Sequence, residues 1–303
     1  MTNIGNNKET HDIMENSVYT PSEVLERIMQ AGEKRILLPV VRCILLGMLA
    51  GGFIAFGAAA SSVAAHQIAN TGVSRLAMGA VFPVGLMMIV LVGGELFTGD
   101  CLMVTGLWDR RYGIGQMIRV LTLVWFSNLV GSVLIAALVS YSGIFSYSEG
   151  GLGAFMIKIA YGKCGMQPLQ AFVSGILCNI LVCCAVLMTT AAKDVVGKIA
   201  AIFFPIMAFV VGGWEHCVAN MFYLPAGIFA AYDSGYVEKA TELYGLRAQQ
   251  IQEQVNVVGF LKNMIPVTIG NIVGAMVFIA LPLFIIHKGK QVNKDSVKFS
   301  MKT

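Results

Sequence analysis

A glutamate and a histidine stand side by side in the stretch GGWEHCVANM, where Glu215 and His216 follow two glycines inside a long apolar run. An ionisable group at membrane depth is costly and indicates a functional site by default. Imidazole has the side-chain pKa nearest to physiological pH, so His216 can offer a proton or a positive charge to a weak-acid anion. The alternative is a neutral ring that bonds to the backbone.

The same pattern occurs earlier, because VFPVGLMMIVLVGGELFTGD shares a Phe-Pro pair, a Gly-Gly pair and a glutamate with AIFFPIMAFVVGGWEHCVAN. Adjacent glycines each weaken a helix by about 1 kcal/mol relative to alanine. Non-helical backbone at this depth requires protein or water beside it. We therefore predict two helix breaks facing a central pathway, rather than the close helix packing expected of glycines such as Gly131 and Gly270. The break residues are Gly93, Gly94, Glu95, Gly212, Gly213 and Glu215.

A helix that restarts after such a break points its free amides and positive dipole end into the pathway. We expect the second half-helices to begin near Asp100 and between His216 and Asn220. The two glutamates are expected to accept hydrogen bonds from the freed backbone amides, the alternative being a proton relay. The arrangement suits a small anion.

The elements that must position these residues are membrane helices, since the 303-residue chain is 56% hydrophobic and only 13% charged. A span needs about 20 apolar residues. Six spans are predicted, and the fold class is all-α integral membrane. Because the two breaks fall three spans apart, the halves of the chain cross the membrane in opposite directions, as an inverted 3+3 repeat. The spans are 38–64, 79–108, 116–141, 168–191, 199–232 and 264–286.

Lysine and arginine favour both termini in the cytoplasm. We expect a tail over 1–35, a channel domain over 36–287 and a basic tail over 288–303, with no cleaved signal peptide. Residues 20–35 have a helix-start signature, with Thr20 as N-cap, Pro21 next and Glu23 three residues after the cap. This amphipathic helix is either an interfacial anchor or a gate.

Other functional classes find little support in the sequence. It has no nucleotide-binding loop, HExxH or GxSxG motif, and its seven cysteines form no CxxC pair. We expect no enzyme activity, no metal and no cofactor. The net charge of +4 is explained by the tails and loops, so no nucleic-acid partner is expected.

Four ordered motifs resemble the formate/nitrite transporter family: VGGELFTG (92–99), GILCNILVCCA (175–185), GGWEHCVANMF (212–222) and NMIPVTIGNIVGA (263–275). The resemblance implies a homopentamer of aquaporin-like subunits in the lipid bilayer, with one pore in each subunit. It also implies transport of small monovalent anions.

The resemblance also carries roles onto matching positions. Leu86 and Phe209 correspond to hydrophobic constrictions, and Leu96 lines the first break. Thr98 and His216 correspond to a facing pair that contacts the anion. The further positions implied are the outer-vestibule lysine Lys163 and the signature asparagines Asn179, Asn263 and Asn271. Asp100 departs from the family's usual asparagine, and we expect it to cap the following half-helix, the alternative being repulsion of anions.

We therefore expect a channel or proton-linked facilitator of the plasma membrane. Formate is the first choice of substrate, nitrite is next and hydrosulfide is third. The class-level alternative is an alternating-access proton symporter for a short carboxylate. A redox or sensor protein is disfavoured because the ligands for a cofactor are missing.

Overall fold

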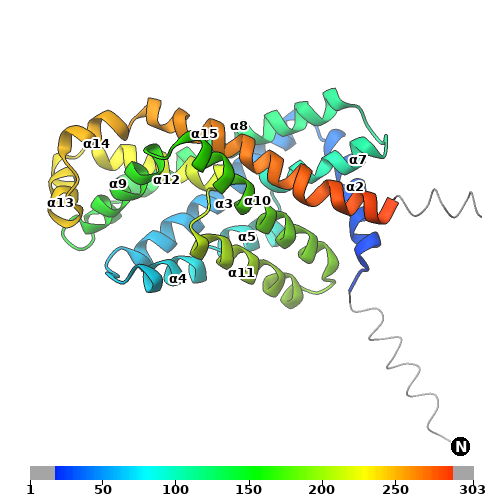
Figure 1. Cartoon of the computed structure of the whole chain (residues 1–303), viewed down its shortest axis with the longest axis horizontal. Coiled ribbons are helices and arrows are strands. Elements are labelled where there is room, and N and C mark those ends of the chain that lie inside the picture. The colour runs from blue at the N-terminus through cyan, green and yellow to red at the C-terminus, as the bar shows by residue number, and fades with distance from the viewer. Residues whose placement is uncertain (1–17, 289–303) are drawn as a thin grey trace, which may run out of the picture.

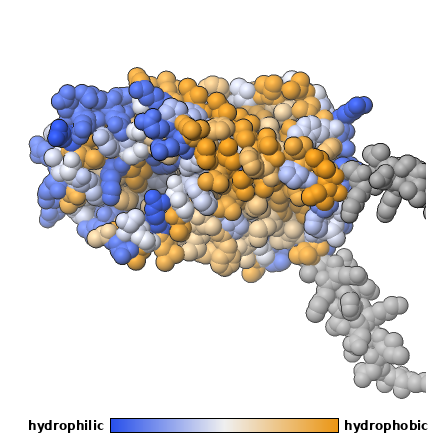
Figure 2. Space-filling view, in the orientation of Figure 1, coloured by the Kyte–Doolittle hydropathy of each residue, from blue (hydrophilic) through white to orange (hydrophobic). Residues whose placement is uncertain are grey.

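The structure, a computed structural model, describes residues 18–288. Most of the two predicted tails, at 1–17 and 289–303, lies outside this range. Within it, six helices are long and apolar enough to cross a membrane, and they run side by side along the long axis of the molecule (Figure 1). Figure 2 shows a broad apolar band on the visible face, with a hydrophilic end beyond it.

The six spans confirm the predicted number, and three of them match the predicted bounds closely. The second, fifth and sixth spans begin earlier than expected, at Thr71, Val195 and Val257 instead of 79, 199 and 264. The sixth span runs through a π-helical segment, η3 (Gly274–Ala280), to Lys288. The helices are α3 (Val40–Ala65), α4 (Thr71–Val81) with α5 (Val84–Val92), α8 (Ile114–Tyr141), α10 (Pro168–Ala191), α11 (Val195–Gly212) and α15 (Val257–Val273).

Both predicted helix breaks are present. After α5 the chain leaves the helix and re-enters α6 (Phe97–Asp100), η1 (Cys101–Met103) and α7 (Val104–Trp108). After α11 it re-enters α12 (Cys217–Ala231). The half-helices therefore start at Phe97 and Cys217, which is three residues before Asp100 in the first case.

The two halves have the same internal packing. Helix α3 packs along α8 in the first half, and α10 packs along α15 in the second. A Cβ atom on Gly131 would collide with the carbonyl of Met48, and one on Gly270 would collide with the carbonyl of Phe172. These glycines allow close helix contact, whereas Gly93 and Gly213 adopt positive φ angles of 113° and 71° at the breaks, which suit glycine.

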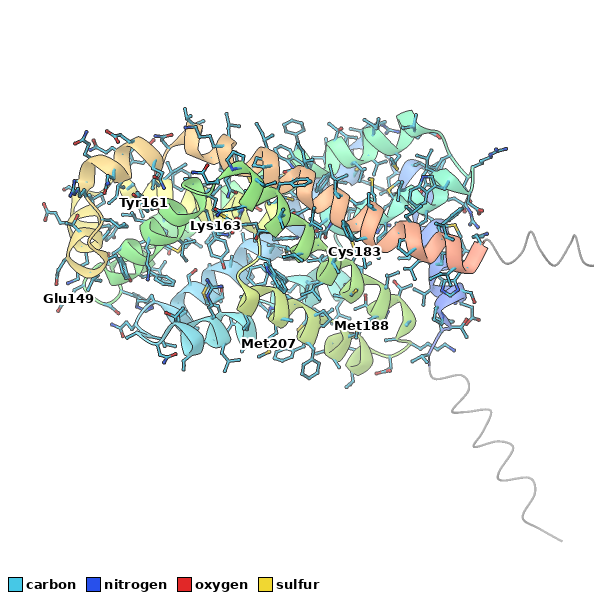
Figure 3. The ribbon with its side chains drawn as sticks, viewed as in Figure 1. Glu149, Tyr161, Lys163, Cys183, Met188 and Met207 are labelled. Carbon is cyan, nitrogen blue, oxygen red and sulfur yellow. The ribbon has the colours of Figure 1, made fainter. Side chains whose placement is uncertain are left out.

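Two helices outside the spans also match between the halves. Helix α2 (Pro21–Ile36) starts at Thr20, whose backbone amide and hydroxyl both donate to Glu23, so the predicted helix start is confirmed. Helix α9 (Gly151–Cys164) occupies the glycine-rich loop. It runs from the polar end near Glu149 into the bundle, where Lys163 lies (Figure 3). The polar end is completed by η2 (Ile144–Ser146), α13 (Ser234–Tyr244) and α14 (Ala248–Gln254).

Candidate functional site

Two buried asparagines fasten the helix breaks to the bundle in the same way. Asn128 of α8 donates to the carbonyls of Gly47 (2.8 Å) and Glu95 (2.9 Å) and accepts from the amide of Phe97 (3.0 Å). A free amide or carbonyl in the membrane core costs several kcal/mol, so each break needs such a partner.

The second break repeats these three bonds. Asn271 of α15 donates to the carbonyls of Gly175 (2.8 Å) and Glu215 (3.0 Å) and accepts from the amide of Cys217 (2.9 Å). The expectation that the glutamate carboxylates accept the freed backbone amides is therefore wrong. The side-chain oxygens of Asn128 and Asn271 accept from the amides of Phe97 and Cys217 instead.

The matched bonds define which residues are equivalent in the two halves. Leu96 and His216 each precede a half-helix, and their backbones are nearly identical, with φ and ψ of −108° and 116° against −109° and 117°. Leucine in one half thus takes the place of histidine in the other. Thr98 lies two residues beyond Leu96 and has Val218 as its equivalent.

The imidazole of His216 joins the two breaks. Its Nδ1 accepts a hydrogen bond from the amide of Ala219 at 3.1 Å, so His216 is the N-cap of α12. Its Nε2 lies 2.9 Å from the hydroxyl of Thr98. Because a backbone amide can only donate, Nδ1 has to be the acceptor, and the neutral ring carries its proton on Nε2. Both side chains are buried.

Two cavities approach this bond from opposite ends of α3. The Lys163 cavity, of about 1170 Å³, reaches from His66 at the end of α3 down to His216. The Arg35 cavity, of about 750 Å³, reaches from Leu46 near the start of α3 to Leu96. The first is also lined by Phe209, Gly213 and Glu215, and the second by Leu86, Gly93, Gly94, Glu95 and Asp100.

Apolar side chains lie where the two cavities approach each other. On the Lys163 side, the rings of Phe82 and Phe209 meet edge to face at 5.5 Å, and Phe209 lies 5.8 Å from the imidazole of His216. On the other side, Leu86 and Leu96 are buried. An ion stripped of water is strongly disfavoured in such surroundings.

Each cavity contains a cation paired with the glutamate of its break. Lys163 Nζ lies 2.7 Å from Glu215 Oε1, and Arg35 Nε lies 2.5 Å from Glu95 Oε2. Arg35 stands twelve residues before Gly47, as Lys163 stands twelve before Gly175. The second oxygen of Glu215 accepts from two buried amides, those of Asn220 (2.6 Å) and Asn263 (3.3 Å).

Asp100 does not cap a half-helix, so that expectation is wrong. It is the last residue of α6, whose N-cap is Leu96. Its Oδ1 instead lies 3.0 Å from Arg35 Nε. The physical reason is that the half-helix starts earlier than expected, which puts Asp100 one turn inside it and turned towards α2.

The signature asparagines are buried and bonded within the protein. Asn179 of α10 donates to the backbone carbonyls of Thr98 (3.2 Å) and Asn271 (2.7 Å), and so links the half-helix after the first break to α15. Asn263 donates to the carbonyl of Lys163 at 3.0 Å, which fixes the end of α9. These contacts orient the cavity walls.

A polar cluster at the ends of the spans fastens α2 beneath the Arg35 cavity. Arg111, in the α7–α8 connection, contacts Glu26 (2.6 Å) and Asp109 (2.8 Å), and Lys288 reaches Asp109 (3.2 Å). The hydrogen bond from Arg111 lowers the pKa of Glu26. Burial raises the pKa of Tyr112 to about 12, and its hydroxyl donates to the carbonyl of Met103.

Sequence reasoning missed three members of the site, Arg35, Asn128 and Asn220. The signal for Arg35 was its spacing to Gly47, which equals that of Lys163 to Gly175. Asn128 would have followed from Asn271 by the repeat, as the asparagine of the third span. For Asn220, the only signal in the sequence was its position one helical turn after His216. Across residues 18–288, no group of three histidine, cysteine or acidic side chains could hold a metal ion.

An inverted repeat with two broken spans, and with two cavities that approach an apolar constriction from opposite ends, is the architecture of a membrane transport protein. A family model described as formate/nitrite transporter matches residues 22–285, and the chain belongs to this family. It is therefore a transport protein and not an enzyme.

Several relatives are similar over most of their length. A probable formate transporter of Methanothermobacter thermautotrophicus is 38% identical over 285 residues, covering 88% of this chain and 96% of that protein. The formate channel FocA of Haemophilus influenzae is 38% identical over 210 residues, covering 69% and 73%. A solved structure described as a pentameric formate channel with formate bound aligns with a TM-score of 0.73 and 34% identity, covering 82% of this chain and 97% of that one.

Proposed function

We propose that the chain forms a homopentameric channel for small monovalent weak-acid anions, with formate as the preferred substrate and nitrite next. The observation that carries the proposal is that two cavities, each with a cation, approach the Thr98–His216 bond and its apolar surroundings from opposite ends. Relatives named as formate channels and transporters, and the pentameric formate channel of similar fold, support the substrate and the assembly.

A proton accompanies the anion in this proposal. A cation inside a cavity raises the local anion concentration, and the apolar constriction favours a neutral species. The anion therefore takes up a proton in the Lys163 cavity and crosses as the neutral acid. Because Nδ1 of His216 is engaged by Ala219, a second proton on the ring would break the helix cap. We infer that water in the cavity supplies the proton and that Nε2–H orients the substrate.

We place the protein in the cell membrane with the Arg35 cavity facing the cytoplasm. More cationic residues lie on that side than on the other, and this excess follows the orientation rule for short loops. Among the described residues they include Arg27, Lys34, Arg35, Arg110, Arg111, Lys193, Lys198 and Lys288, against Arg75, Lys158, Lys163, Lys239, Arg247 and Lys262 on the opposite side. Both termini are then cytoplasmic.

The test is uptake of labelled formate into proteoliposomes, with nitrite and hydrosulfide as competitors. We expect uptake driven by the gradients of formate and protons, with weak saturation, and stronger competition by nitrite than by hydrosulfide. Stronger competition by hydrosulfide would make the chain a hydrosulfide channel of the same family. Clear saturation of uptake at low formate concentration, in place of weak saturation, would instead identify an alternating-access symporter.

A further inference from the structure

Asp100 and Asn220 occupy equivalent places in the two halves of the chain. Each stands five residues after the glutamate of its break, and each is buried. Asn220 donates from Nδ2 to Glu215 at 2.6 Å. The carboxyl of Asp100 is likewise within hydrogen-bonding reach of Glu95, but two carboxylates can only accept. The bond that asparagine makes in one half requires a proton in the other.

The charges around Asp100 do not balance without that proton. Arg35 Nε lies 2.5 Å from Glu95 and 3.0 Å from Asp100. Among the described residues, Arg35 is the only cation within 4.0 Å of either carboxylate. Two ionised carboxylates and one guanidinium leave a net charge of −1 in a largely buried place, which is costly. Carboxylates that share a site disfavour double ionisation.

One oxygen of Asp100 supports the same conclusion. Oδ1 faces Arg35, whereas Oδ2 is fully buried and has no hydrogen-bond partner among the described residues. An ionised oxygen in this situation loses its hydration without compensation. A proton on Asp100 removes the charge from this unpartnered oxygen and makes the carboxyl a donor.

The other groups around the pair do not supply the missing charge. The thiols and the phenol near it are neutral at neutral pH. The cations along the cavity wall lie beyond ion-pair distance of Asp100, and two of them, Arg27 and Lys193, stack over the ring of Tyr19 at 3.4 and 4.4 Å. The groups concerned are Cys43, Cys101, Tyr112, Arg119, Arg27, Lys193 and Lys198.

We propose that Asp100 is a proton-binding site of the Arg35 cavity, with one proton held between Asp100 and Glu95 beside Arg35. With the proton bound, the three side chains are neutral together and an anion can approach from this side. When the proton leaves to water, the net charge becomes −1 and the anion is repelled. Transport from the Arg35 side therefore falls as the pH on that side rises, a consequence that rests on the proposed function.

Infrared spectroscopy of the whole channel tests the proton without any transport. The wild type is expected to show the carbonyl stretch of a buried protonated carboxylic acid, shifted in heavy water. Asp100→Asn is expected to lose this band. Glu95→Gln is expected to lose it as well, because Asp100 then becomes the sole anionic partner of Arg35. Absence of the band in the wild type, or its persistence in both variants, overturns the proposal.

Formate flux, measured in vesicles that hold the channel in opposite orientations, tests whether transport from the Arg35 side falls as the pH on that side rises. Asp100→Asn keeps a donor for Glu95 and has no proton to lose, so it is expected to retain flux and to lose the dependence on pH at the Arg35 side. Asp109→Asn, whose carboxylate pairs with Arg111 and Lys288, is the matched control and should keep the wild-type profile.

Two results contradict the proposal. Asp100→Asn could raise flux by one factor at every pH, which means that Asp100 is always ionised, or it could keep the wild-type profile, which means that the proton is elsewhere. If the wild type moves no formate but shows the infrared band, the proposed function fails and the proton site stands.

Discussion

The imidazole of His216 belongs to both halves of the site: it caps α12 through Ala219 and faces the hydroxyl of Thr98 in the other break. The cap assigns the acceptor role to Nδ1 and leaves Nε2–H for the pathway. The fold thus selects one neutral tautomer, and the ring acts as a hydrogen-bond donor held in a fixed orientation.

Two substitutions of His216 separate its role as the cap of α12 from its role in the transport pathway. Asparagine can cap α12 but neither takes up nor releases a proton. His216→Asn is therefore expected to keep its stability and to show a lower formate flux that still rises at low pH. His216→Leu loses the cap and is expected to lose about 1 kcal/mol of stability. Thermal unfolding and flux against pH are the measurements. Loss of the pH dependence in His216→Asn would show that the imidazole itself donates the proton.

Variants of the Lys163–Glu215 pair separate an effect on stability from an effect on formate uptake, since Lys163 is 18% exposed and Glu215 only 5%. Lys163→Met leaves a buried carboxylate without its cation and is expected to cost about 3 kcal/mol, the low end for such pairs, because two amides still bind Glu215. The double variant with Glu215→Gln should recover the stability but not the formate uptake at low concentration. Recovery of uptake in the double variant would contradict a role of Lys163 in collecting anions.

Asn271 is predicted to matter more for stability than its single side chain suggests. Asn271→Ala leaves the amide of Cys217 and the carbonyl of Glu215 without their side-chain partner, at a cost of about 1–3 kcal/mol for each group. The control is Asn70→Ala, which removes the exposed cap of α4 and should cost about 1 kcal/mol. Equal losses in thermal unfolding would argue against Asn271 as the fastener of the break.

The cluster that holds α2 predicts a dependence of stability on acid. The pKa of Glu26 is lower in the folded protein than its ordinary value of 4.5, chiefly through the hydrogen bond from Arg111. This contribution is fully present above pH 4.5 and is lost as the pH falls through the lowered pKa. The thermal midpoint should therefore fall below pH 4.5 in the wild type and fall less in Arg111→Met. Identical curves would show that the pair does not contribute.

Much of the fold follows from the sequence because apolar length and repeated glycines are local signals. The six spans and the two breaks need nothing beyond these signals and the size of the membrane. The role of the glutamates was not predictable in the same way. Glu95 and Glu215 bind cations from α2 and α9, 60 and 52 residues earlier in the chain, and only the folded arrangement brings these partners together.

The site was predictable where one residue acts alone and was missed where residues act as partners. His216 stands out as an ionisable group in an apolar run. Asn128 does not, because a single polar residue inside an apolar span is unremarkable until its bonds to Gly47 and Phe97 are known. Asp100 was misplaced because the start of a half-helix, and thus the direction in which Asp100 points, depends on those same bonds.

The near-identical backbones of Leu96 and His216 bear on how such a chain can arise. Suppose that an ancestor paired two identical half-length chains in opposite orientations across the membrane. Equivalent positions would then hold the same residue, giving two histidines or two leucines before the two half-helices. Fusing the halves into one gene removes that constraint. The single chain can then present an imidazole to one compartment and a hydrocarbon to the other, an asymmetry that no pair of identical halves could acquire by mutation.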